Sequence, residues 1–402
     1  MLRAFLLVAL ALGLASGALA ATQTPEDGWT ATTLAKELEG PVDLVFGRDG
    51  TLYYAELDTG NVRAIPPGAR APLADPLAHV DSFRDENGGL LGLAVDPDFA
   101  HTHAFFVYYS IQKASGPVNR VSRLDAAGET VLVDDIPHFE RHNGGRLVFT
   151  GPDSLVVTTG DNEKRAPAQD VNSLLGKTLR MTRDGKPAPD NPDPTKLMYT
   201  LGHRNPFGLA YDAENGVLWE TENGPASDDE VNILRAGQNY GWPERVGITN
   251  SKTYIDPVVE FDKTIGPTGG TVLKGDFYFG AVNDGKVRRV HPDGAGHYAD
   301  SVVWDGVIAL DVEAGPDGNL YVSSFNDITI LTPPGGSPPT GAPPVATPSA
   351  APPTGAPPTG APPATSPQES GAPDAKARIP GAGVALVAGA ALVALAARRR
   401  NG

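Results

Sequence analysis

Residues 201–244, LGHRNPFGLAYDAENGVLWETENGPASDDEVNILRAGQNYGWPE, contain the pattern that best indicates the fold of this chain. Two runs of strand-forming residues, 208–212 and 217–222, are separated by the turn sequence Ala-Glu-Asn-Gly. Short apolar runs joined by a turn of this composition are typical of a β-hairpin. The stretch therefore predicts two neighbouring antiparallel strands.

Polar groups that a hairpin does not need flank these two strands. HRN (203–205) comes before the first strand, and NGP (223–225) and DDE (228–230) come after the second. Because the strands run in opposite directions, the start of the first and the end of the second lie at the same end of the sheet. We therefore expect a site with a fixed cation, an amide, two free carbonyls and three carboxylates. Taken singly, each motif is also compatible with ordinary turn and surface chemistry.

The same pattern of short strands and Gly/Asp-rich turns recurs along the middle of the chain. Six such units lie between residues 41 and 331, at a spacing of roughly fifty residues. This pattern predicts an all-β fold, a six-bladed β-propeller over residues 29–331. Residues 29–34 stand outside the six units and are expected to complete the last blade and close the ring. A long sandwich or a β-helix is the alternative, but sandwiches seldom repeat one turn pattern at blade spacing.

The two ends differ from the middle in composition. Residues 1–20 have an early arginine, an apolar run and a small-x-small cleavage site, which predict a secretory signal peptide. Residues 333–378 are rich in Pro, Gly, Ala and Thr and predict an extended, disordered stalk. Residues 379–397 are apolar and precede three arginines, which indicates either a membrane anchor or a sorting signal that is cleaved. We therefore expect an exported protein held at the cell surface by its C-terminus.

Composition excludes several function classes. The chain has no cysteine, which excludes disulfides, thiolate metal sites and cysteine nucleophiles. Its formal net charge of −16, with no basic cluster before the last few residues, argues against a nucleic-acid partner.

A candidate general base lies in the third unit. His142 comes just before the first strand of this unit, and Asp161 follows its second strand, so both fall at one end of one hairpin. A carboxylate beside a neutral histidine fixes the imidazole tautomer and stabilises the imidazolium that forms when a proton arrives. Such a pair can also be purely structural.

The order of these motifs resembles that of the soluble quinoprotein glucose/sorbosone dehydrogenases. The resemblance runs from about residue 41 to about residue 331 and includes GHRNP, the GP and SDDE segments, NYGWP, a His-x-x-Gly-Arg loop at His142 and a Gly-Asp at Asp161. It implies oxidation of an aldose sugar to its lactone by pyrroloquinoline quinone (PQQ) on a bound Ca²⁺, with electrons passed to an external acceptor.

The resemblance also assigns roles to residues. His142 would take the proton of the anomeric hydroxyl while the quinone accepts a hydride, Asp161 would orient His142, and Arg204 would stabilise the oxygen that becomes negative. The carbonyls of Gly224 and Pro225 would coordinate Ca²⁺, with Asp229 positioning its waters. The residues that would contact the cofactor are Asn87, Arg204, Asn205 and Asn223.

The sequence departs from the family at two places. The family has an Arg-x-Arg-Asp segment that pairs with the quinone carboxylates, whereas this chain has Ile308 and Leu310 at the matching arginine positions. Asn283 stands where some members have a lysine. Each lost charge-assisted hydrogen bond is typically worth about 1.5–3 kcal/mol.

Three functions of different classes are therefore compared. The first is a PQQ- and Ca²⁺-dependent sugar dehydrogenase. The second is a sugar-binding or adhesive surface propeller without a cofactor, which the two absent arginines and the predicted anchor favour. The third is a Ca²⁺-dependent lactonase-type hydrolase, which would need an axial ligand cluster that the sequence does not reveal.

Overall fold

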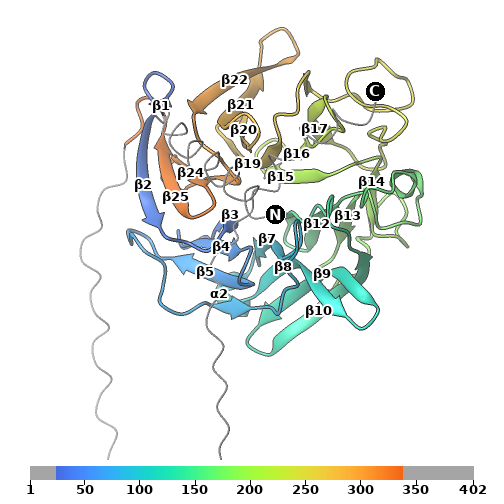
Figure 1. Cartoon of the computed structure of the whole chain (residues 1–402), viewed down its shortest axis with the longest axis horizontal. Helices are drawn as coiled ribbons and strands as arrows, with labels where there is room; N and C mark the ends of the chain where they lie inside the picture. Colours follow the sequence, from blue (N-terminus) through green and yellow to red (C-terminus); the bar gives the residue numbers. More distant parts are fainter. Residues whose placement is uncertain (1–23, 338–402) are drawn as a thin grey trace, which may run out of the picture. The chain divides into compact units, whose positions relative to one another are not determined.

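The computed structural model describes residues 24–337, which form six antiparallel sheets arranged as the blades of a β-propeller (Figure 1). The sheets follow one another in chain order, and the first strand of each blade packs beside the first strands of its neighbours around the central channel. The predicted all-β class and six-bladed architecture are confirmed.

Within each of the first three blades, neighbouring strands are antiparallel and follow one another in chain order from the channel outward. They are, in blade 1, β3 (Pro41–Phe46), β4 (Leu52–Glu56), β5 (Asn61–Ile65) and β6 (Ala78–His79); in blade 2, β7 (Leu90–Val95), β8 (Phe105–Lys113), β9 (Gly116–Asp125) and β10 (Gly128–Pro137); in blade 3, β11 (Leu147–Gly151), β12 (Ser154–Thr159), β13 (Lys177–Met181) and β14 (Met198–Leu201).

The remaining blades follow the same plan. Their strands are, in blade 4, β15 (Pro206–Asp212), β16 (Val217–Glu222), β17 (Asp229–Leu234) and β18 (Val259–Phe261); in blade 5, β19 (Pro267–Leu273), β20 (Asp276–Ala281), β21 (Lys286–Pro292) and β22 (Tyr298–Asp305); in blade 6, β23 (Asp311–Ala314), β24 (Leu320–Ser323) and β25 (Asp327–Thr332). The hairpin predicted from residues 208–222 is β15–β16, in which Asp212 pairs with Val217. The described residues contain two short helices, α2 (Phe99–Thr102) and the 3₁₀ turn η1 (Ala166–Gln169).

The N-terminal part of the described chain closes the ring. Strand β2 (Thr30–Lys36) pairs with β25 and supplies the fourth strand of blade 6, as expected for residues 29–34. Strand β1 (Thr24–Pro25) pairs with β22, so residues before 29 also join the propeller. Both pairings cover edges that would otherwise expose unpaired backbone groups.

Most residues of the segments predicted at the two ends lie outside the described part of the chain. The signal peptide (1–20), nearly all of the stalk (333–378) and the apolar segment (379–397) lie outside the described residues. Among residues 24–337, no helix has both the length and the apolar character needed to cross a membrane.

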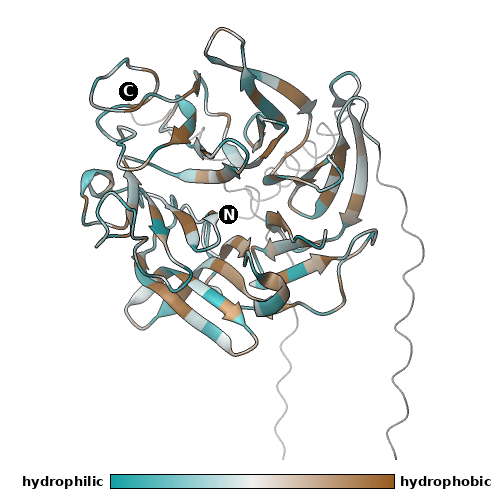
Figure 2. Cartoon of the chain, turned by 180° about the vertical axis from the view of Figure 1, so that it is seen from behind, coloured by the Kyte–Doolittle hydropathy of each residue, from teal (hydrophilic) through white to brown (hydrophobic). Residues whose placement is uncertain are grey.

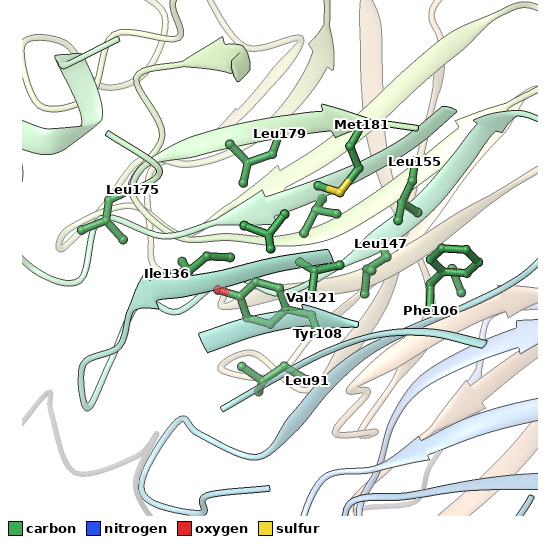
Figure 3. Close-up of a cluster of buried hydrophobic side chains, with 13 residues drawn as sticks. Leu91, Phe106, Tyr108, Val121, Ile136, Leu147, Leu155, Leu175, Leu179 and Met181 are labelled. Carbon is green, nitrogen blue, oxygen red and sulfur yellow. The ribbon is translucent and has the colours of Figure 1, made fainter. Parts of the chain in front are cut away.

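Apolar side chains between the blades hold the propeller together. Figure 2 shows hydrophobic residues concentrated in the strands and hydrophilic residues in the loops. Between blades 2 and 3, Leu91 and Phe106 belong to the same buried cluster as Leu155 and Leu179 (Figure 3). Burying one such side chain is worth about 1.5–3 kcal/mol. The inner strands approach so closely that a Cβ on Gly92 would lie 1.9 Å from the carbonyl oxygen of Gly145, so only glycine fits there.

One buried arginine ties several blades together at the channel. Arg146, which directly precedes β11, places its Nη1 2.6 Å from Oδ1 of Asp43 in blade 1. Its Nε donates to the carbonyl of Phe207 in blade 4 at 2.9 Å, and its Nη2 donates to the carbonyl of Leu310, next to blade 6, at 3.2 Å. These bonds link the start of blade 3 to blades 1 and 4 and to the segment before blade 6.

Candidate active site

The predicted site residues occupy loops at one rim of the propeller. His142 lies in the loop before β11 and Asp161 follows β12, whereas Arg204 precedes β15 and Asn223 follows β16. In each hairpin the start of the inner strand and the end of the second strand meet at the same end of the blade. The adjacent blades 3 and 4 therefore present these four residues on one face.

His142 and Asp161 form a hydrogen-bonded pair. Nδ1 of His142 lies 2.7 Å from Oδ1 of Asp161, and the side chains are 11% and 0% exposed. The loop is tightly constrained, because His142 has a φ of 61° and a Cβ on Gly160 would lie 1.9 Å from the carbonyl oxygen of His142. With Asp161 on Nδ1, the tautomer that carries its proton on Nδ1 leaves Nε2 free to accept a proton. The predicted pairing of these residues is present.

Asp161 is held by further donors. Nε1 of Trp242 donates to Oδ2 of Asp161 at 2.8 Å, and the backbone N–H of Glu163 donates to Oδ1 at 2.8 Å. Burial alone would raise the pKa of Asp161, but the hydrogen bonds from His142 and Trp242 outweigh it and hold this pKa below its usual range. Asp161 is thus kept ionised beside the imidazole.

Arg204 lies beside Trp242. Its guanidinium carbon lies 5.5 Å from the centre of a Trp242 ring, and that of Arg165 lies 5.3 Å from a ring of the same residue. Nη1 of Arg204 donates to the carbonyl of Asn223 at 2.8 Å, which fixes the direction of the side chain. Burial lowers the pKa of Arg204, an effect that the charge of Asp161 opposes, and the guanidinium remains a cation at neutral pH.

Glu222, the last residue of β16, holds the backbone of the Arg204 loop. Its Oε1 accepts the N–H of Arg204 at 2.9 Å and that of Asn205 at 2.5 Å. The side-chain amide of Asn223 donates to the carbonyl of Pro267 in blade 5, at 3.0 Å. In contrast, Oδ1 of Asn205 is buried and receives no hydrogen bond within residues 24–337. This orphaned oxygen indicates a missing polar partner at the site.

The Gly224–Pro225 turn presents two backbone carbonyls. Within the described chain, no hydrogen bond reaches either carbonyl. Asp229 braces this turn from below, since its Oδ1 accepts the N–H of Gly224 at 2.7 Å and its Oδ2 accepts the N–H of Gly266 at 2.8 Å. Burial raises the pKa of Asp229 to about 6, although these hydrogen bonds oppose the rise.

Two of the three carboxylates expected at residues 228–230, Asp228 and Glu230, line the small pocket that also contains Gly224 and Pro225, whereas Asp229 does not. Asp229 and Glu230 begin β17, so their side chains point to opposite faces of the strand. Oε1 of Glu230 accepts the N–H of Gly247 at 2.6 Å. Asp228 is half-buried and lines the same small pocket as Gly224 and Pro225.

Asn87 lies in the loop before β7 and is half-buried. Its carbonyl accepts the side-chain amide of Asn143 at 3.2 Å, which connects it to the residue that follows His142. Within the described residues its own side-chain amide makes no hydrogen bond. Asn87 therefore borders the His142 loop and has a side chain available for a ligand.

The structure also places the residues at which the sequence departs from the family pattern. Ile308 is 40% exposed, and the backbone carbonyl of Leu310 accepts Nη2 of Arg146. Asn283 is exposed, and its side-chain amide donates to the carbonyl of Thr264 at 3.3 Å. None of the three supplies a cation.

Sequence reasoning missed two residues that organise this site. Trp242 was visible only as part of the NYGWP motif, and Glu222 only as the end of a predicted strand. Both act through hydrogen bonds to residues in other loops, which strand periodicity does not reveal.

The chain belongs to the glucose/sorbosone dehydrogenase family, whose profile matches residues 38–331. Among curated proteins, it is 30% identical over 338 residues to the aldose sugar dehydrogenase YliI of Escherichia coli K12, covering 72% of this chain and 88% of that protein. It is also 30% identical over 258 residues to quinoprotein glucose dehydrogenase B of Acinetobacter calcoaceticus, covering 55% of this chain and 54% of that protein.

Solved structures show the same fold. The PQQ-bound form of the aldose sugar dehydrogenase of Streptomyces coelicolor superposes with a TM-score of 0.68 at 28% identity, covering 77% of this chain and 99% of that chain. The family resemblance inferred from the sequence motifs is confirmed.

Proposed function

We propose that this protein is a PQQ-dependent sugar dehydrogenase that oxidises an aldose to its lactone and uses Ca²⁺ to hold the cofactor. The observation that carries the proposal is the His142–Asp161 pair, which shares one rim with the Arg204 guanidinium and the Gly224–Pro225 carbonyls. Family membership and the PQQ-bound relative support the same function.

His142 is the general base. Since Asp161 occupies Nδ1, the lone pair on Nε2 accepts the proton of the anomeric hydroxyl, and the carboxylate stabilises the imidazolium that results. A positioned base of this kind contributes about 10²–10⁴-fold to the rate.

The site fits an anionic quinone with exposed carbonyl and carboxylate oxygens. Arg204 offers a fixed cation, and the amide of Asn205, whose Oδ1 is orphaned, and the free amide of Asn87 offer polar partners. When bound, PQQ supplies the two-electron acceptor that no side chain provides. Asn223 contributes by fixing Arg204 through its carbonyl.

The Gly224–Pro225 turn fits a hard cation. Ca²⁺ takes oxygen ligands at about 2.3–2.6 Å, and two unbonded carbonyls on a braced turn are ligands of this type. Buried Asp229 holds the turn in place, because its Oδ1 accepts the N–H of Gly224 at 2.7 Å. The negative charge of this carboxylate also favours a cation at the turn.

The proposal includes an extracellular compartment and an external electron acceptor. A signal peptide at 1–20 and an apolar segment at 379–397 support export and attachment at the cell surface, where electrons would pass to an external acceptor. A cofactor-free sugar-binding propeller is the second candidate, favoured by the exposed Ile308 where an arginine is expected.

Equilibrium dialysis of the purified protein against PQQ, with Ca²⁺ or with a chelator, tests the proposal. We expect bound quinone absorbance that requires Ca²⁺, followed by dye reduction when an aldose is added. Absence of quinone binding at saturating PQQ and Ca²⁺ would leave the sugar-binding function. Hydrolysis of a lactone without PQQ would favour the lactonase-type hydrolase instead.

A further inference from the structure

A cluster of side chains that can ligate a metal lies in blade 4, next to the Arg204 loop. It consists of His203, Glu220 and Glu222, whose ligand atoms all lie within 4.8 Å of one another. Glu220 and Glu222 are two residues apart on β16 and so face the same side of the sheet. All three residues are buried, and the side chains of His203 and Glu220 are 0% exposed.

The spacing of these atoms suits a small metal ion. Nδ1 of His203 lies 3.2 Å from Oε1 of Glu220 and 3.1 Å from Oε2 of Glu222. Metal–ligand bonds of about 2.0–2.2 Å place neighbouring ligand atoms roughly 3.0–3.5 Å apart. Two of the three separations therefore match those around a shared ion, and all three ligand atoms lie within 4.8 Å of one another.

Hydrogen bonds within the cluster leave one buried oxygen unsatisfied. Oε1 of Glu220 is buried and receives no hydrogen bond in the part of the chain that the structure describes. A single N–H on Nδ1 of His203 can serve only one of the two carboxylates, and it is directed to Glu222. If His203 instead keeps its proton on Nε2 for Thr200, 2.8 Å away, a lone pair on Nδ1 faces two carboxylates. A metal ion satisfies the three atoms in this second arrangement, in which the Nε2 proton is donated to Thr200.

The charge of the cluster points the same way. Glu230 adds a third buried carboxylate through Asn232, which donates to both Glu220 and Glu230. Among residues 24–337, His203 forms the salt bridges of Glu220 and Glu222, and no lysine or arginine pairs with any of the three glutamates, so one imidazole faces three buried carboxyl groups. Buried charges are costly unless they are paired or bind a metal.

The neighbours hold the cluster rigidly, as expected for a preformed site. The ring of Tyr240 stacks on His203 with centres 5.0 Å apart, and Oε1 of Glu222 is engaged by the backbone of Arg204 and Asn205. Partners of this kind orient metal ligands.

We propose that His203, Glu220 and Glu222 bind one divalent first-row transition ion of the Zn²⁺ class. An imidazole nitrogen with two carboxylates suits such ions, whereas Ca²⁺ prefers six to eight oxygen ligands, so this site is chemically distinct from the Gly224–Pro225 turn. Because Glu222 also holds the Arg204 loop, the ion stabilises the floor of the active site and does not take part in the reaction.

The test uses the full-length protein refolded with Co²⁺ or Zn²⁺ in excess Ca²⁺, without PQQ. After gel filtration we expect about one Co²⁺ or Zn²⁺ per chain by elemental analysis, with a visible absorption band for Co²⁺. Glu220→Gln should lower the affinity at least about tenfold. The matched control Glu56→Gln, which removes a buried carboxylate of blade 1, should retain the metal.

Two outcomes would overturn the proposal: wild-type protein without bound Co²⁺ or Zn²⁺, or Glu220→Gln that binds as tightly as wild type. Should Glu220→Gln fail to fold, X-ray absorption at the metal edge of the wild-type protein decides, since one nitrogen and two carboxylate ligands are expected. Neither readout depends on PQQ, so failure of this site is distinguishable from failure of the dehydrogenase function.

Discussion

Nδ1 of His142 lies 2.7 Å from Oδ1 of Asp161, and Nε1 of Trp242 approaches the other oxygen of the same carboxylate at 2.8 Å. A residue in the loop between β17 and β18 of blade 4 thus fixes the partner of a base in blade 3. Since the carboxylate orients the imidazole, the geometry of proton transfer depends on contacts between blades.

Replacing Asp161 should change how stability depends on pH. The folded-state pKa of Asp161 is depressed, so its stabilising contribution is present above the unfolded value of about 3.9 and is lost as pH falls through the folded value. Asp161→Asn should cost about 1–3 kcal/mol near neutral pH, because its amide N–H₂ faces another donor. Urea denaturation from pH 7 to pH 3 measures the free energy of unfolding of both proteins. The difference between wild type and Asp161→Asn should become smaller below about pH 4. A difference that stays constant over this range would contradict the assignment.

The hydrogen bond that Trp242 donates to Asp161 can be tested separately from the packing of its ring. Trp242→Phe keeps an aromatic ring beside Arg204 but removes the N–H that Asp161 accepts. Steady-state kinetics should show a rate about tenfold lower, with PQQ affinity nearly unchanged. Trp219→Phe is the control, because Nε1 of Trp219 has no hydrogen-bond partner in the described structure. Equal rates for the two variants would show that the Trp242 hydrogen bond does not contribute to catalysis.

Gly224 allows the turn that presents the proposed Ca²⁺ ligands. A Cβ there would lie 2.2 Å from the carbonyl oxygen of Ser227 and 2.6 Å from that of Asp228, so Gly224→Ala must displace the backbone. Calorimetric titration with Ca²⁺ in the presence of PQQ should show an affinity at least about tenfold lower. Gly151→Ala should leave Ca²⁺ binding unchanged, because its Cβ would meet nothing closer than 3.8 Å. Unaltered Ca²⁺ binding in Gly224→Ala would place the ion elsewhere.

Arg146 should be important for stability. Arg146→Met leaves the buried carboxylate of Asp43 without its cation, and breaking a buried pair in this way costs about 3–5 kcal/mol. Lys196→Met is the comparison, since its contact with Asp193 at 3.8 Å is exposed and worth less than about 1 kcal/mol. If the denaturation curves of the two variants coincide, Arg146 does not stabilise the contacts between blades.

The sequence predicted the features that repeat or that lie within one hairpin. Strand alternation and recurring turns predicted six blades and the closing strand, and antiparallel pairing placed His142 with Asp161. It did not predict contacts between blades, such as Trp242 with Asp161, since which donor meets which acceptor depends on packing between distant segments. Three acidic residues at 228–230 suggested one cluster; Asp228 and Glu230 do share the pocket at Gly224 and Pro225, whereas the alternation of β17 directs Asp229 to the face opposite Glu230.

The central claim is that His142 is the base of a quinone-dependent oxidation. His142→Gln keeps a polar side chain of similar reach but cannot accept a proton at neutral pH. The variant should therefore fold and bind PQQ with Ca²⁺ as the parent does.

Stopped-flow spectroscopy of quinone reduction by an aldose, with the parent and His142→Gln proteins both reconstituted with PQQ and Ca²⁺, measures this step directly. We predict a rate lower by about 10²–10⁴-fold in the variant. Reduction of the quinone at the parent rate would show that His142 is only a loop residue and would contradict the mechanism.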